Sequence, residues 1–140
     1  MNDESPRYNI GQAARRTGVP AKTIRYYESI GLLPPALRGE NGYRFYGTND
    51  LETLRFIHRA RALGFALKDV GNLLALWHDK DRCSADVKRL ATDHIATVEK
   101  RIAELESIRR SLVDLTKRCH GDDRPECPIL GDLAGKSAQR

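Results

Sequence analysis

The chain has 140 residues and a mass of 15.8 kDa, which is room for one ordinary domain or for a small domain followed by an extended element. Charged residues make up 31% of it, and its longest nearly apolar stretch, residues 70–77, is far shorter than the roughly 20 residues of a membrane-spanning helix. The first six residues are acidic and polar rather than basic and then apolar, so we expect a cytoplasmic protein with no membrane partner.

Positive charge is concentrated in the N-terminal half. The whole chain carries a formal net charge of +5, and residues 1–66 hold ten basic groups against six acidic ones. Nine of these ten basic groups are arginines, whose guanidinium suits bidentate contacts with phosphate and guanine. The distribution favours a nucleic acid as the partner of this half.

Two short helices are predicted first. Residues 10–17 followed by Gly18 indicate a helix closed by a glycine, and Pro20 stands at the start of a second helix over residues 21–30. Two such helices joined by a short turn form a helix-turn-helix. Its small core is predicted from Ile10, Ala14, Val19 and Ile24.

A hairpin is expected next, because residues 38–46 combine an Asn41-Gly42 turn with a β-favouring aromatic run. Arg38 and Arg44 lie on either side of the turn, where they can follow a phosphate backbone or enter a minor groove. The alternative is that they are ordinary surface arginines. A hairpin after a helix-turn-helix is typical of a winged-helix DNA-binding domain.

Two connecting helices follow the hairpin. The first is predicted over residues 51–63, capped by Asn49 or Asp50, and the second over residues 68–77. Their apolar residues recur at helical spacing, so we expect inner faces made of Leu54, Ile57 and Ala60 or Arg61 in the first helix and of Val70, Leu73, Leu74 and Trp77 in the second.

A single long helix is predicted over residues 84–118, which contain neither Gly nor Pro. At 1.5 Å per residue it would extend about 50 Å. Its apolar residues recur at steps of three and four, as in a coiled-coil seam: Val87, Ala91, Ile95, Val98, Ile102, Leu105, Ile108, Leu112 and Leu115. We therefore expect a homodimer in which this helix pairs with its symmetry mate, and the alternative is a helix folded back on its own N-terminal domain.

The helix over residues 21–30 has the composition of a recognition helix. Lys22, Arg25 and Tyr26 share one side, while Ile24 and Tyr27 point toward the core. Arg25 can meet a base edge, Lys22 a phosphate, and the Tyr26 hydroxyl the DNA backbone. The alternative is a solvated basic face.

Three cysteines are an odd number, which argues for thiol or metal chemistry rather than a disulfide framework. Cys119 and Cys127 lie eight positions apart in a loop after the long helix, and Pro128 can begin a short final helix whose N-terminus stabilises a thiolate. Soft thiolates select Cu(I) and its heavier relatives, and a pair of ligands favours a monovalent ion over Zn(II). Idle thiols, an oxidation-prone dithiol and part of a zinc site remain alternatives.

Four ordered motifs resemble the MerR family of bacterial transcriptional regulators: IRYYE at residues 24–28, GLLP at 31–34, NGYRFY at 41–46 and LGF at 63–65. The resemblance extends from about Asn9 to Leu133. Within the family, SADVK at 84–88, CHGDD at 119–123 and CPI at 127–129 are similar to the copper-efflux branch, the CueR and HmrR type.

The resemblance implies a mainly α fold: a winged helix-turn-helix DNA-binding domain, a long antiparallel coiled-coil dimerisation helix and a C-terminal metal-binding loop. The corresponding divisions are flexible tails at residues 1–8 and 134–140, the DNA-binding domain at 9–78, the dimerisation helix at 84–118, and the metal loop with a short terminal helix at 119–133. The residues predicted to bind operator DNA are Lys22, Thr23, Arg25, Tyr26, Tyr27, Arg38, Tyr43, Arg44 and Arg61.

The implied function is regulatory, not enzymatic. Cys119 and Cys127 would hold one Cu(I), Ag(I) or Au(I) per protomer, and the homodimer would activate copper efflux or tolerance genes by distorting an overlong promoter spacer. Double-stranded promoter DNA is then the partner, and RNA polymerase is reached indirectly through it.

Cys83 and His120 are candidate additional ligands. Divalent-ion relatives in the family carry a cysteine at the start of the dimer helix, where this chain has Ser84, and Cys83 precedes it by one position, a rotation of about 100° on a helix. If Cys83 does join the site, the ion becomes divalent: zinc, mercury, lead or cadmium. A thiol redox switch and a non-catalytic adaptor are the alternatives from other classes.

Overall fold

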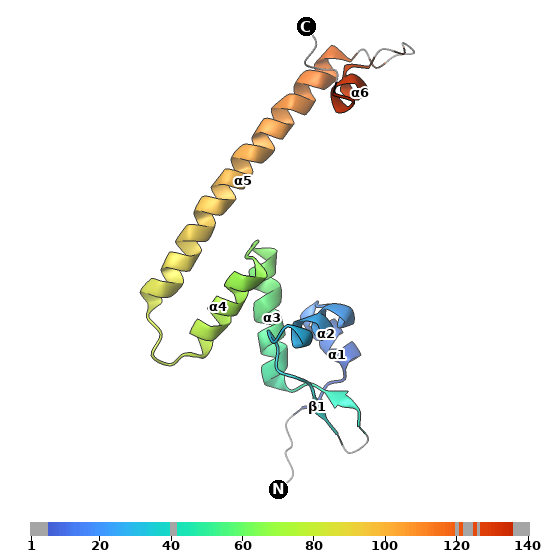
Figure 1. The fold of residues 1–140 in the computed structure, drawn as a ribbon. Coiled ribbons are helices and arrows are strands. Elements are labelled where there is room, and N and C mark those ends of the chain that lie inside the picture. Colours follow the sequence, from blue (N-terminus) through green and yellow to red (C-terminus); the bar gives the residue numbers. More distant parts are fainter. Residues whose placement is uncertain (1–5, 40–41, 120, 122–124, 126, 136–140) are drawn as a thin grey trace. The chain divides into compact units, whose positions relative to one another are not determined.

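The computed structural model of the chain describes residues 6–39, 42–119, 121, 125 and 127–135 (Figure 1). It divides into two compact units, Met1–Ala91 and Thr92–Arg140. The described residues are mainly helical, with one two-stranded sheet among them. No helix among them is both long and apolar enough to span a bilayer.

The predicted helix-turn-helix is present as α1 (Ile10–Thr17) and α2 (Ala21–Ser29). Asn9 caps α1 reciprocally, because its side chain accepts from the Gln12 N–H at 2.8 Å while the Gln12 side chain accepts from the Asn9 N–H at 2.9 Å. Gly18 ends α1 with a φ of 78°, a left-handed conformation that favours glycine. Helix α2 begins directly after Pro20, as predicted.

The hairpin consists of β1 (Leu37–Arg38) and β2 (Arg44–Phe45), which pair antiparallel. Gly42, with a φ of 76°, donates its N–H to the Gly39 carbonyl at 2.9 Å, and Asn41 of the predicted turn lies outside the described residues. We call β1, β2 and their turn the wing.

The chain ahead of α1 is anchored to the wing. Tyr8 forms an antiparallel bridge with Tyr46, in which the Tyr8 N–H donates at 2.9 Å and the Tyr46 N–H donates back at 2.7 Å. Tyr8 is therefore anchored, although the predicted flexible N-terminal tail included it. Residues 1–5 and 136–140 of the two predicted tails lie outside the described residues.

The connecting helices are α3 (Thr48–Ala62) and α4 (Leu67–His78). The predicted start of α3 was wrong, because Gly47 rather than Asn49 or Asp50 occupies the N-cap position. Asp50 instead lies in the first turn, where its carboxylate accepts the Gly47 N–H at 2.9 Å. Ala60 rather than Arg61 completes the inner face of α3, since Ala60 is buried and Arg61 is exposed.

One apolar core lies among α1, α2, α3, α4 and the segments that connect them, including Leu33 and Tyr46. Ala13 of α1 is fully buried, while the predicted core residues Ile10 and Ala14 are only partly covered at its margin. The remaining buried members of this core are Val19, Ile24, Tyr27, Leu33, Tyr46, Leu51, Leu54, Ile57, Ala60, Phe65, Val70 and Leu74.

The long helix α5 (Ser84–Arg118) has the predicted bounds and crosses from the first unit into the second. Its predicted seam is largely uncovered in the single chain, since six consecutive members from Ile95 to Leu112 are each 38–55% exposed. Leu115 is buried, at 4% exposure, and Val87 is partly covered. The short helix α6 (Pro128–Leu133) follows the loop after α5.

Candidate functional site

Helix α2 presents the predicted basic face to solvent. Lys22 and Arg25 are exposed and the Tyr26 side chain is half-exposed, while Ile24 and Tyr27 are buried in the core. The structure thus gives the Tyr27 ring a packing role, and a DNA contact for it stays a prediction. The burial pattern follows from helical spacing, which puts positions three apart on one face.

Arg38 and Arg44 lie directly opposite each other on the two strands of the wing. Paired residues of this kind project from the same face, with Cβ atoms roughly 5 Å apart, and like charges so placed destabilise a hairpin. Both residues are exposed. An anion laid against this face would relieve the repulsion, which is what a phosphate backbone provides.

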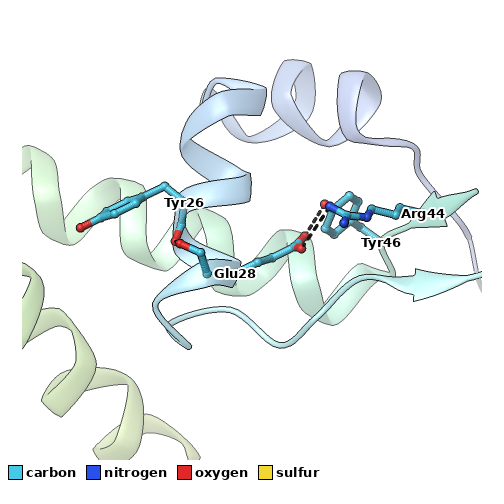
Figure 2. Close-up of polar contacts among 5 residues, drawn as sticks. Tyr26, Glu28, Arg44 and Tyr46 are labelled. Carbon is cyan, nitrogen blue, oxygen red and sulfur yellow. Dashed lines mark hydrogen bonds and ion pairs between the residues drawn. The ribbon is translucent and has the colours of Figure 1, made fainter.

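Glu28 connects α2 to the wing (Figure 2). Its carboxylate accepts a short hydrogen bond from the Tyr46 hydroxyl and lies 3.9 Å from the Arg44 guanidinium. The Glu28 side chain is only 12% exposed, so this bond is largely shielded from water. Helix α2 and strand β2 are therefore held together by a charge-assisted contact, while Tyr26 points away from it in the same view.

This environment raises the pKa of Tyr46 above its usual range. Burial is the largest cause, followed by the hydrogen bond to Glu28 and its negative charge, and the charges of Arg44 and Arg25 act in the opposite direction. Tyr46 therefore stays protonated and remains a donor to Glu28.

Sequence reasoning did not assign Glu28 or Tyr46 a role. The two residues are 18 positions apart, and neither helical nor strand periodicity relates them. The available signal is the composition of the motif: Glu28 is the single acid in residues 5–39, beside many arginines.

Two further predicted DNA-binding residues occupy different settings. Tyr43 is 76% exposed at the wing turn and is free to meet a partner. Arg61 is exposed but donates to the Phe65 carbonyl at 2.7 Å, so its guanidinium also stabilises the turn after α3. Thr23 is half-buried on α2.

The predicted metal cysteines are brought together in the second unit. Cys119 follows α5 directly, Cys127 caps the N-terminus of α6, and both residues are partly exposed. The Cys119 side chain contributes to lowering the pKa of the Cys127 thiol, which places the two side chains near each other. The two predicted sulfur donors, eight positions apart in the sequence, are therefore neighbours.

The N-terminus of α6 favours the thiolate of Cys127. The backbone N–H of Leu130 is the largest cause of a lowered pKa for this thiol, assisted by the N–H of Ile129 and by the Cys119 side chain, while partial burial acts against them. No N-cap hydrogen bond of standard geometry is formed. A thiolate with a second sulfur beside it is a donor set suited to a soft ion with low coordination number.

Two candidate additional ligands were predicted beside this pair. His120 lies outside the described residues, and Cys83 is an exposed free thiol in the first unit. Within the described part of the chain, no group of three or more His, Cys, Asp or Glu side chains is placed to hold a metal ion.

Known proteins match nearly the whole chain. Residues 8–76 match the family model described as MerR HTH family regulatory protein, and residues 51–115 match the model described as MerR, DNA binding. The chain is 54% identical over 131 residues to heavy metal-dependent transcription regulator 2 of Rhizobium meliloti (strain 1021), covering 94% of this chain and 89% of that protein.

A second relative is the HTH-type transcriptional regulator CueR of Salmonella typhimurium (strain LT2), at 44% identity over 127 residues, with 91% of this chain and 92% of that protein covered. Among solved structures, the transcription regulator PbrR691 from Ralstonia metallidurans CH34, in complex with lead(II), matches with a TM-score of 0.73 and 35% identity. That match covers 90% of this chain and 98% of the other.

Proposed function

The chain belongs to the MerR family of DNA-binding transcription regulators, which are not enzymes, and from this premise we propose that it activates copper efflux or tolerance genes when it binds Cu(I), Ag(I) or Au(I). The observation that carries the proposal is the nearness of two cysteines, Cys119 at the end of α5 and Cys127 at the N-cap of α6. Two soft donors suit a monovalent ion of low coordination number, whereas Zn(II) generally takes four ligands. Relatives that include CueR support the same branch.

The proposed DNA contacts combine α2 and the wing. Lys22 and Arg25 would contact phosphate and a base edge, while the paired arginines of the wing would neutralise the flanking backbone. The shared carboxylate of Glu28 holds these two parts together, so they would dock as one rigid surface.

The exposed seam of α5 supports a homodimer. Six consecutive apolar side chains left 38–55% exposed on a 35-residue helix would be covered by an antiparallel copy of the same helix. Two DNA-binding units related by a two-fold axis would then bind a pseudo-palindromic operator in successive major grooves.

Activation would proceed by distortion of the promoter. With about 10.5 base pairs per turn, each surplus pair in a spacer rotates one polymerase element by about 34° relative to the other. Bending and untwisting DNA costs on the order of 1 to 6 kcal/mol. The ion must bind the activating conformation more tightly than the resting one by a comparable free energy, and the polymerase would sense only the altered DNA.

The ion is tested by anaerobic titration of the reduced protein with Cu(I), Pb(II) and Zn(II). We expect one Cu(I) per protomer, abolished in Cys119→Ser and in Cys127→Ser and retained in Cys83→Ser. Cys83→Ser is the matched control, because it removes the remaining thiol of the chain, which is exposed and belongs to the first unit. Tight Zn(II) or Pb(II) binding that Cys83→Ser abolishes would overturn the monovalent assignment.

The lead(II)-bound structural relative makes a divalent-ion sensor the nearest second candidate. In that case Cys83 would add a third sulfur, supplied by one protomer to the other. The pairing of the two thiols also permits a Cys119–Cys127 disulfide, which mass spectrometry with and without reductant detects. If operator affinity and transcription followed that disulfide rather than the ion, the protein would be a redox switch.

A further inference from the structure

Arg7 is held on the wing. Its guanidinium carbon lies 4.4 Å from the centre of the Phe45 ring, within the range of a cation–π contact. The backbone is anchored at the residue that follows Arg7, because Tyr8 pairs with Tyr46 through two backbone hydrogen bonds. Arg16 also covers the Tyr8 ring, at 4.8 Å. Arg7 thus belongs to the DNA-binding unit rather than to a free tail.

The alternation of side chains along strand β2 shows on which face of the wing Arg7 lies. Successive side chains of a strand point to opposite faces. Arg44 and Tyr46 both reach Glu28, so they share one face, and Phe45 between them points to the other. Arg7 lies over Phe45, so it is on the face opposite the Arg38–Arg44 pair.

The charge of Arg7 is not neutralised within the described chain. Arg7 is exposed and forms no ion pair with any residue that the structure describes, whereas Arg44 has Glu28. A guanidinium stacked on an aromatic ring keeps its N–H donors directed outward. The contact also limits the conformations of the Arg7 side chain, so less conformational entropy is lost when a partner binds. Both faces of the wing therefore carry exposed guanidinium groups.

An element that is cationic on two opposite faces fits a groove with phosphates on both sides. The minor groove of DNA is about 6 Å wide and is bordered by the backbones of the two strands. A wing carrying arginines on one face alone would be matched to one of those backbones. Arg7 provides the complement for the other.

We propose that Arg7 contacts a phosphate of the operator on the strand opposite to the one met by Arg38 and Arg44, so that the wing is clamped between both backbones of a minor groove. This proposal rests on the proposed function, because it requires that the protein bind a specific operator. Phe45 acts as the positioning residue, because its ring holds the guanidinium in place.

The experiment uses the full-length protein and a duplex that the wild type has selected from a random-sequence pool. Equilibrium binding is measured between 50 and 200 mM salt for the wild type, Arg7→Ala, Phe45→Leu and the control Arg101→Ala. Arg101→Ala removes the same charge from α5, where Arg101 lies 3.7 Å from Glu104. Each lost phosphate contact lowers the slope of log affinity against log salt by about 0.9 per bound head.

For Arg7→Ala we expect the slope to fall by this amount. Raising the salt from 50 to 200 mM should then weaken its binding by a factor roughly 3-fold smaller, per bound head, than it weakens wild-type binding. Phe45→Leu should keep most of the slope and bind less tightly. Replacing single phosphates along each DNA strand with neutral methylphosphonates locates the contact. At one position on the opposite strand, the replacement should weaken binding by the wild type and leave binding by Arg7→Ala unchanged.

An Arg7→Ala variant with the wild-type slope and the wild-type methylphosphonate pattern would overturn this assignment and leave the proposed function standing. A reduction equal to that of Arg101→Ala would also overturn it, because it would reflect net charge alone. If the wild type selects no duplex from the pool, the proposed function itself fails. Circular dichroism confirms that each variant is folded.

Discussion

Glu28 makes the connection between α2 and the wing testable through the stability of the first unit. The Tyr46 hydroxyl donates to a carboxylate that is 12% exposed, and a hydrogen bond to a charged group contributes about 1.5–3 kcal/mol. The Arg44 pair spans 3.9 Å with an arginine side chain 48% exposed, so solvent screening limits it to about 1 kcal/mol or less. We therefore expect Tyr46→Phe to lower the free energy of unfolding by about 2 kcal/mol, and Arg44→Ala by less.

Urea unfolding followed by tryptophan fluorescence measures this loss. Trp77 is the single tryptophan in the sequence, and on α4 it stacks on Phe56 of α3 with ring centres 4.7 Å apart. Its emission therefore reports on the packing of the unit that contains Glu28. Tyr43→Phe is the matched control, since it removes a hydroxyl from a side chain that is 76% exposed.

A double-mutant cycle isolates the contact itself. Glu28→Gln combined with Tyr46→Phe should cost less than the sum of the single changes, with a coupling of at least 1 kcal/mol by order of magnitude. The reasoning is refuted if Tyr46→Phe destabilises no more than Tyr43→Phe, or if the two single effects are additive.

Three further changes test other parts of the fold. Because the pKa of Tyr46 is raised in the folded state, the Tyr46 hydroxyl loses its proton at lower pH in the unfolded chain than in the folded one. As pH rises above about 10, the wild type should therefore lose stability relative to Tyr46→Phe, measured by paired urea titrations. Stability curves that stay parallel with pH would contradict the raised pKa. Asn9→Ala removes the reciprocal cap of α1 and should cost about 1 kcal/mol in urea unfolding, whereas Asn9→Ser should retain most of it. Ile102→Lys places a charge in the exposed seam of α5 and should shift sedimentation velocity toward the monomer, while Lys100→Ala should not; an unchanged dimer would argue against this seam as the interface.

Local sequence patterns predicted much of the architecture. Helix α5 has the bounds predicted from its freedom from Gly and Pro, and the caps at Gly18 and Pro20 define the helix-turn-helix as expected. These features depend on backbone preferences within a few residues. The start of α3 was misplaced for a related reason: Asp50 does serve the helix terminus, but from inside the first turn rather than at the cap.

Tertiary structure decided what those patterns do not encode. The contact of Glu28 with Tyr46, the place of Arg7 over Phe45 and the approach of Cys119 to Cys127 each join residues whose spacing follows no helix or strand period. The sequence alone determined most of the helices, the hairpin and the basic face of α2, because periodicity and residue chemistry are local properties. Which side chains meet, and on which face of the wing a charge stands, depends on how the chain packs around its core, so only the folded structure could provide it.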